Sequence, residues 1–217
     1  MEGEDELEYK MYSHRYALPI LNTDRDFAEI WLEVQEVIHN ISETQLINHF
    51  NAKGDRRGKS ISSTINELLK IGFVNKGWRS ESPIFQNSQY EGDTWRLDFA
   101  KENISIEVAF NHGSAIAWNL LKPVLASELN HVEKAIQTKV GIIICATEAM
   151  RVNGGFDSAV GTYEKFLKYL PPLNNQLSVP LLVIGLEAPK TFSITHVKEP
   201  NRPKIGVIYK IINYSID

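Results

Sequence analysis

The centre of the chain reads Trp95-Arg96-Leu97-Asp98-Phe99-Ala100-Lys101-Glu102-Asn103-Ile104-Ser105-Ile106-Glu107-Val108-Ala109-Phe110. It predicts two short strands, Trp95–Phe99 and Ile104–Phe110, joined by a polar turn at residues 101–103. In the second strand the even-numbered positions are all apolar, so one face packs on a core. The opposite face carries Glu107, and the first strand carries Asp98. Adjacent antiparallel strands can bring two such carboxylates within a short cross-strand distance.

Outward from this pair, the chain alternates apolar helical stripes with buried strands. The segments expected after it are a long helix at Ala115–Thr138, strands at Val140–Ala146 and Val179–Leu186 around a helix at Thr162–Tyr169, and a hairpin over Phe192–Ile212. The segments expected before it are an irregular lead-in at residues 1–23 and helices at Asp24–Ile41 and Ile61–Ile71, the second ended by Gly72. This order predicts an α/β fold with helices covering a mixed sheet, in one domain of residues 1–217 that has a β extension at residues 190–217.

The composition is that of a globular protein. Hydrophobic residues make up 43% of the 217 residues, enough for a full core. No apolar run reaches the roughly 18 residues that a membrane span requires, and the acidic N-terminus lacks the features of a signal peptide. The single cysteine, Cys145, excludes an internal disulfide and a cysteine zinc cluster, so we expect a cytoplasmic protein. The net charge of −4 argues against a large sequence-independent nucleic-acid binder, but a basic cleft can lie within an acidic surface.

Asp98 and Glu107 are the candidate ligands of a metal ion. A carboxylate in the middle of a sheet needs a partner, because an unpaired buried charge is costly. Together with the backbone carbonyl of Val108, the two carboxylates form a hard oxygen site suited to Mg²⁺, which can activate water and stabilise charge on a phosphate. The alternative is an ion pair of Asp98 with Arg96 or Lys101 and a solvent-facing Glu107.

The segment Leu97-Asp98-Phe99, followed by Ile106-Glu107-Val108-Ala109-Phe110, resembles the PD-(D/E)xK motif of type II restriction endonucleases. It is most similar to the variant of the BglII/BstYI group, which has Glu-Val-Gln-Phe in the second half. The resemblance extends to Ile30–Glu36 in the first helix, to Ser127-Glu128-Leu129 and His131 after the motif, and to the strand segments Val140–Ile144 and Pro180–Leu186. The shared order of these segments implies a restriction-endonuclease-like fold.

The resemblance also implies that Asp98 and Glu107 bind Mg²⁺, and that Glu33 on the first helix reaches the same site as a further acidic group or through water. The alternative is that Glu33 is an exposed helix charge or that Glu36, one turn on, takes its place. The third motif position is commonly Lys and is Gln or Glu in the nearest relatives. Here it is Ala109, which can neither orient water nor touch a metal.

Three explanations of Ala109 are open. Alanine replaces the native group in an engineered inactive version; or a group of the following segment, Glu128, His112 or Lys122, takes over the role; or the protein binds DNA without cutting it.

Three segments carry side chains suited to DNA recognition, because base edges need hydrogen-bond donors and acceptors and phosphates need cations. They are a basic, Gly-flanked loop, the residues after Glu107, and a Gly-rich loop after the buried strand at residues 140–146, which in the resembled enzymes enters the major groove. The candidate residues are Arg56, Arg57, Lys59, Ser60, Asn111, His112, Ser114, Arg151, Asn153, Asp157 and Ser158. The alternative for each segment is an ordinary solvated loop.

We therefore expect a Mg²⁺-dependent type II restriction endonuclease of a prokaryotic cytoplasm that hydrolyses double-stranded DNA. The resemblance suggests a palindromic site centred on GATC, and a palindrome demands a homodimer with one active site for each strand. Two other functions are open. Ala109 favours a non-cleaving, sequence-specific DNA-binding protein with a nuclease-like fold. The acidic net charge favours an unrelated α/β enzyme or interaction module, although no GxxxxGK[ST], GxGxxG or GxSxG motif is present.

Overall fold

The computed structural model describes residues 6–54, 58–128, 131–198 and 204–211. Its elements are β1 (Tyr9–His14), α1 (Ala17–Thr23), α2 (Arg25–His39), α3 (Glu43–Ala52), α4 (Ser62–Asn75), β2 (Arg79–Pro83), the 3-10 helices η2 (Ser88–Tyr90) and η3 (Asp93–Trp95), β3 (Arg96–Lys101), β4 (Ile104–Ala109), the 3-10 helix η4 (Gly113–Ala115), α5 (Ile116–Ser127), β5 (Val140–Ala146), α6 (Glu148–Asn153), α7 (Tyr163–Tyr169), β6 (Leu181–Leu186), β7 (Phe192–Val197) and β8 (Ile205–Lys210).

The centre of the molecule is a six-stranded mixed sheet in the order β1-β6-β5-β4-β3-β2. The strands β4, β5 and β6 are parallel, and β1 runs antiparallel to β6 at one edge. At the other edge β4, β3 and β2 form antiparallel pairs. The predicted α/β fold with a mixed sheet flanked by helices is confirmed.

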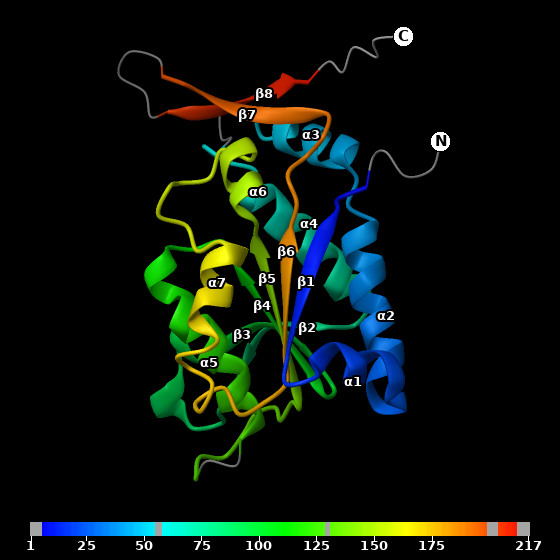
Figure 1. Cartoon of the computed structure of the whole chain (residues 1–217), viewed down its shortest axis with the longest axis vertical. Helices are drawn as coiled ribbons and strands as arrows, with labels where there is room; N and C mark the ends of the chain where they lie inside the picture. The colour runs from blue at the N-terminus through cyan, green and yellow to red at the C-terminus, as the bar shows by residue number, and fades with distance from the viewer. Residues whose placement is uncertain (1–5, 55–57, 129–130, 199–203, 212–217) are drawn as a thin grey trace.

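Helices cover both faces of this sheet (Figure 1). On one face, α1, α2 and α4 share a core with the strand residues Ile106 and Ile142. On the other face, α5 and α7 share a core with Ile143 and Val183. Successive residues of a strand point to opposite faces, so the apolar run of β5 supplies both cores.

A glycine fixes how closely α5 approaches the sheet. A Cβ atom on Gly141 of β5 would lie 2.4 Å from Cβ of Pro123 in α5 and 2.7 Å from Cδ2 of Leu181. Both distances are shorter than van der Waals contact, so only glycine lets the helix lie this close to β5. Pro123 lacks a backbone N–H and therefore removes one hydrogen bond inside α5. The residue before it is Lys122, whose position is thus set by a tight packing contact.

Two expectations about helix ends are wrong. α4 does not end at Gly72 but continues to Asn75, because Gly72 is a packing position: a Cβ there would lie 2.7 Å from Cγ1 of Val37 in α2. The long helix expected at Ala115–Thr138 ends at Ser127. Beyond it the backbone pairs with the segment before β3, since the amide of Ala135 donates to the carbonyl of Ile84 at 2.9 Å.

The irregular lead-in expected at residues 1–23 is wrong for its described part, which contains β1 and α1. β1 pairs along its whole length with β6, from Tyr9 opposite Leu186 to His14 opposite Leu181. Most of its side chains are exposed or half-buried, so the segment has no apolar pattern of its own. Its structure comes from pairing with a buried neighbour.

The strands β7 and β8 form a separate hairpin that lies across one end of the molecule, near α3 and α6 (Figure 1). The hairpin packs on the described part of the loop before α4: the amide of Gly206 donates to the carbonyl of Gly58 at 3.0 Å, and His196 Nε2 lies 3.0 Å from the carbonyl oxygen of Lys59. In the part of the chain that the structure describes, none of the helices has the length and apolar character needed to cross a membrane.

We expect Gly141→Ala to lower the free energy of unfolding by about 1–3 kcal/mol, because the new methyl group overpacks the contact between β5 and α5. The matched control is Gly58→Ala, where the nearest heavy atom to an added Cβ is 3.6 Å away and little change is expected. Urea denaturation of both variants measures the difference. Equal stability of the two variants would contradict this account of how α5 is held.

Candidate active site

The two predicted carboxylates lie on neighbouring antiparallel strands. Asp98 belongs to β3 and Glu107 to β4. The register pairs Phe99 with Ile106, and one step further along both strands it places Asp98 opposite Glu107. The polar turn and the alternating pattern of the sequence therefore bring the two acidic groups together as expected.

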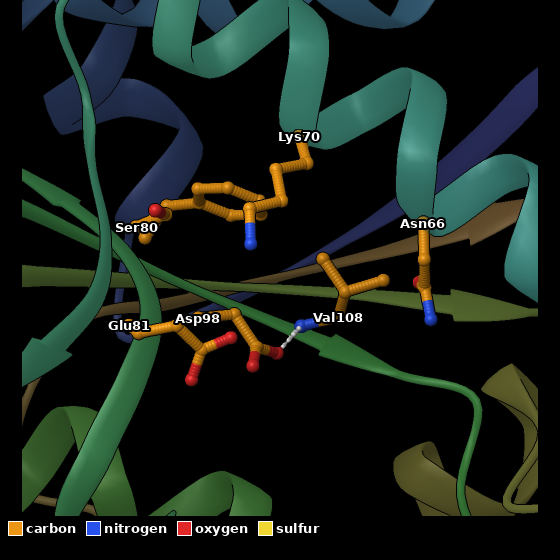
Figure 2. A pocket seen from close by; sticks show the side chains of 7 residues that line it. Asn66, Lys70, Ser80, Glu81, Asp98 and Val108 are labelled. Carbon is orange, nitrogen blue, oxygen red and sulfur yellow. Dashed lines mark hydrogen bonds between the residues drawn. The ribbon is translucent and has the colours of Figure 1, made fainter.

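Asp98 is partly buried and lines a small cavity of about 130 Å³ between β3, β4 and α4. Its Oδ2 accepts a hydrogen bond from the backbone N–H of Val108 at 2.6 Å (Figure 2). Burial raises the pKa of Asp98, the hydrogen bond from Val108 and the charge of Lys122 lower it, and the charge of Glu81 raises it. The carboxylate thus sits among charges of both signs.

Glu107 is 2% exposed and lies beneath α5. Its Oε2 accepts a hydrogen bond from Nζ of Lys122 at 2.8 Å. Its Oε1 is buried and has no hydrogen-bond partner among the described residues. Desolvation, followed by the negative charge of Asp98, raises the pKa of Glu107 to about 8 against the opposing effect of Lys122. A buried carboxylate with an unsatisfied oxygen is a group that a cation would stabilise.

A third carboxylate, Glu81, was not identified from the sequence. The register of β2 with β3 pairs Ser80 with Phe99 and Ser82 with Leu97, so Glu81 falls opposite Asp98. The carboxylates of Glu81 and Asp98 point to the same side of the strands and both residues line the cavity (Figure 2). Glu81 has a φ of 51°, a left-handed conformation that is rare for a side-chain-bearing residue and is often found at functional sites.

The signal that could have located Glu81 was weak. It lies in a polar five-residue strand, Arg79–Pro83, within a region whose glycines and turn residues hide the strand. Pairing with β3, and not a pattern within the segment, makes it a strand.

The alternative pairings considered for Asp98 and Glu107 are not observed. Lys101 binds Glu33, with Nζ 2.7 Å from Oε1, and Arg96 lies 3.5 Å from Asp93. The burial of Glu107 excludes a solvent-facing side chain.

The hydrogen bonds of Glu33 join it to Lys101 and Trp78 and not to Asp98 or Glu107, so the expectation that it reaches the metal stays a prediction. Both of its oxygens accept hydrogen bonds from Lys101, and Oε2 also accepts one from the indole of Trp78 at 2.9 Å. Lys101 ends β3 at the turn, about 10 Å along the strand from Asp98 at the usual rise per residue. Glu36 forms an ion pair with Lys76 instead.

The position of Ala109 explains why no side chain from it reaches the carboxylates. It is 1% exposed and packs in the core formed with Ile116 and Leu120 of α5. It lies on the same face of β4 as Glu107, two residues further on. The side chain of Lys122 extends from α5 and occupies the space beside Glu107.

The donor set fits a hard divalent cation, although no three His, Cys, Asp or Glu residues within residues 6–54, 58–128, 131–198 and 204–211 already lie as close as a metal cluster requires. The nearby oxygens are those of Asp98, Glu107 and Glu81, and one of them is buried without a partner. Carboxylate oxygens are the ligands that Mg²⁺ prefers, and Mg²⁺ keeps several water ligands, so two or three protein oxygens suffice.

The segments expected to read DNA lie together, in the parts that the structure describes. The amide of Gly113 donates to the carbonyl of Ala159 at 2.7 Å, and the amide of Gly161 donates to the carbonyl of Asn111 at 3.0 Å. The amide of Ile61 donates to the carbonyl of Gly154. These bonds join the residues after β4, the loop after α6 and the loop before α4 at one end of the sheet.

Most of the candidate DNA-binding side chains at this end are accessible. Those that are exposed are Lys59, Asn111, His112, Ser114, Asp157 and Ser158, and those that are half-buried are Ser60, Arg151 and Asn153. Arg151 is on α6, in an ion pair with Glu148. Asn111 Oδ1 accepts a hydrogen bond from Nδ2 of the buried Asn119 at 3.0 Å, which fixes its orientation. Arg56 and Arg57 lie outside the described residues.

The raised pKa of Glu107 predicts a loss of stability with rising pH in metal-free protein. Because its pKa of about 8 in the folded protein exceeds its ordinary value of 4.5, the folded state binds a proton that the unfolded state releases. Stability therefore falls as the pH rises from about 5 to 8. We expect Glu107→Gln to flatten this dependence, because the variant has no carboxyl group at this position to titrate. Thermal melts in EDTA between pH 5 and 8, with the exposed Glu133→Gln as the control, measure this. A melting temperature that falls as steeply with pH in Glu107→Gln as in the control would contradict it.

Comparison with known proteins assigns the family. The family model described as "Restriction endonuclease BglII/BglIII" matches residues 9–186, while no curated protein matches the chain. The crystal structure of restriction endonuclease BglII complexed with a DNA 16-mer has a TM-score of 0.62 and 19% sequence identity, over 94% of this chain and 100% of that one. The crystal structure of free BglII has a TM-score of 0.57 and 20% identity, with the same coverage. Because the family model covers most of its length, the chain belongs to the BglII/BglIII family of restriction endonucleases, which are site-specific deoxyribonucleases.

Proposed function

We propose that this protein is a Mg²⁺-dependent type II restriction endonuclease and that Asp98 and Glu107 hold the metal ion. The observation that carries the proposal is the pair of carboxylates opposite each other on β3 and β4, one of them buried with a free oxygen. Membership of a restriction endonuclease family supports the same chemistry.

The residues that would hold the metal are Asp98, Glu107 and the backbone carbonyl of Val108, with Glu81 as a further acidic group that lines the same cavity as Asp98. A divalent cation bound there supplies a Lewis acid that stabilises charge on the phosphate and favours attack by water. The overall reaction joins a water oxygen to phosphorus as one phosphoester bond breaks. One water proton passes to solvent and the leaving sugar oxygen takes one from solvent, which gives a phosphomonoester and a hydroxyl group.

The protein's own groups position the reacting phosphate. The hydrogen bond from Val108 holds Asp98 in one orientation, and the ion pair with Lys122 does the same for Glu107. Positioning of this kind lowers the entropy that must be lost in reaching the transition state. Lys70 and Asn66 of α4 line the opposite side of the cavity and offer donors to a DNA backbone (Figure 2).

The joined loops at one end of the sheet supply the DNA-reading surface in this proposal. Lys59 and Arg56–Arg57 would neutralise phosphates, while Asn111, His112 and the loop from Arg151 to Ser158 would reach base edges. A palindromic target, GATC-centred as the resemblance suggests, would be bound by a homodimer so that each active site cuts one strand. Such an enzyme would act in the cytoplasm of a prokaryotic cell.

A second function, specific binding without cleavage, is favoured by Ala109 alone, because no functional atom stands at the third position of the motif. It predicts specific DNA binding that is unchanged by a chelator and no cutting with any divalent metal.

The test is digestion of a plasmid of mixed sequence with Mg²⁺. We expect discrete fragments from the unmodified protein, none after addition of EDTA, and a rate reduced at least about 100-fold by Asp98→Asn, since a charge-stabilising group at the reacting phosphate is lost. Asp93→Asn is the control, because this aspartate is on η3 and almost fully exposed. Cutting by Asp98→Asn at the rate of the control would place the active site elsewhere.

A further inference from the structure

The proposed site contains a buried cation whose role is not assigned by the motif. Lys122 of α5 is 9% exposed, and buried lysines are uncommon unless they are paired. Its Nζ donates one hydrogen bond, to Oε2 of Glu107. A lysine ammonium group has three N–H donors, and the described residues accept only this one. Two donors therefore remain for a ligand or solvent next to the carboxylates.

Lys122 stands near both metal-binding candidates and not only near its partner. Its positive charge lowers the pKa of Asp98 as well as that of Glu107, against burial in each case. A cation that contacts Glu107 and acts on the charge of Asp98 is close to where a phosphate and its attacking water would have to come.

Ala109 and Lys122 form a complementary pair. The small side chain of Ala109 packs against α5, so the helix can lie close to β4, and Lys122 then fills the space beside Glu107. The contact of Pro123 with Gly141 holds the neighbouring residue of the helix in a fixed place. A group held by tight packing keeps its orientation, which is what a group at a reacting centre needs.

The other two residues that could replace the missing group point elsewhere. Glu128 is exposed and bonds to the hydroxyl of Ser178. His112 is exposed, and its Nδ1 lies 2.8 Å from the hydroxyl of Ser114 and accepts a hydrogen bond from the amide of the same residue.

We propose that Lys122, reaching the site from α5, supplies the cationic group that Ala109 leaves out of the motif. This inference rests on the proposed nuclease function. Lys122 takes no part in proton transfer in this proposal. It donates hydrogen bonds to the attacking water and to a nonbridging phosphate oxygen. Its charge offsets the negative charge that builds up as the water oxygen bonds to phosphorus and the leaving sugar oxygen departs.

A purely structural role for Lys122, as the counter-ion of Glu107, makes a different prediction. A bound divalent cation would neutralise Glu107 in its place, so a variant without the lysine would be unstable only in the absence of metal. At saturating metal its cleavage rate would return to that of the unmodified protein.

The experiment compares the unmodified protein with Lys122→Met and Lys122→Gln under single-turnover conditions at saturating Mg²⁺. Glutamine can still donate a hydrogen bond to Glu107. The glutamine variant therefore allows the test to be made even if the methionine variant does not fold. We expect both variants to cut at least about 100-fold more slowly, the usual loss for one stabilising group in the transition state. We expect their DNA affinity in Ca²⁺ to stay within about threefold and their melting temperature in Ca²⁺ to match the unmodified protein, because contacts to DNA are spread over many other residues. Lys168→Met is the control, on an exposed position of α7.

Cutting by either folded variant within about fivefold of the unmodified protein overturns the inference and leaves the nuclease function intact. A second comparison uses Ala109→Lys. If the unmodified protein does not cut but Ala109→Lys does, the group of the third motif position is missing and Lys122 does not replace it. This result overturns the inference about Lys122 and leaves the nuclease function intact. If neither cuts with Mg²⁺ or Mn²⁺, the proposed function fails together with the inference.

Discussion

The hydrogen-bonded ion pair between Glu107 and Lys122 is the contact around which the rest of the site is arranged. It buries a carboxylate and an ammonium between β4 and α5, where loss of either partner would leave an uncompensated charge. Buried ion pairs are weak evidence for added stability, since removing two charges from water is costly. The burial of this pair, beside a second carboxylate and with one oxygen unsatisfied, is better explained by function than by folding.

Three features of the fold determine the geometry of the site. Antiparallel pairing of β2, β3 and β4 sets Glu81, Asp98 and Glu107 in a row across three strands. The close contact between Pro123 and Gly141 then lowers α5 onto the sheet and brings Lys122 to the end of that row. Finally, the loops after β4 and α6 join at the same end of the sheet, where we propose that they bind DNA. A rigid sheet carrying loops of this kind is a common basis for a catalytic site.

The sequence predicted those parts of the molecule that depend on local patterns. The alternation of β4, the turn before it and the first long helix follow from short-range periodicity, and the structure confirms them. Asp98 and Glu107 could be proposed as a pair because a hairpin fixes their separation and because their motif resembles that of a known nuclease family. By contrast, the edge strands β1 and β2 could not be predicted, because they have little apolar pattern and become strands only by pairing with buried neighbours.

The residues that the sequence missed or left undecided share one physical cause. Glu81 meets Asp98 only through the register of β2, and Lys122 meets Glu107 only because α5 packs closely on the sheet. Both contacts depend on tertiary packing, so the spacing of these residues in the sequence does not predict them. Glu33 lies on α2, and both of its carboxylate oxygens accept hydrogen bonds from Lys101 at the end of β3. This contact, which the sequence does not predict, sets the position of Glu33. The backbone freedom of glycine led to the prediction that Gly72 ends a helix. Its role in the structure is to let α4 pack closely against α2.

The most direct test of whether Asp98 and Glu107 hold the metal ion is to locate Mn²⁺ by anomalous diffraction in crystals of the unmodified protein. We expect one strong peak between the carboxylates of Asp98 and Glu107, within bonding distance of an oxygen of each. A peak that lies away from both carboxylates, or none at Mn²⁺ concentrations that support cleavage, would contradict the claim that these strands hold the catalytic metal.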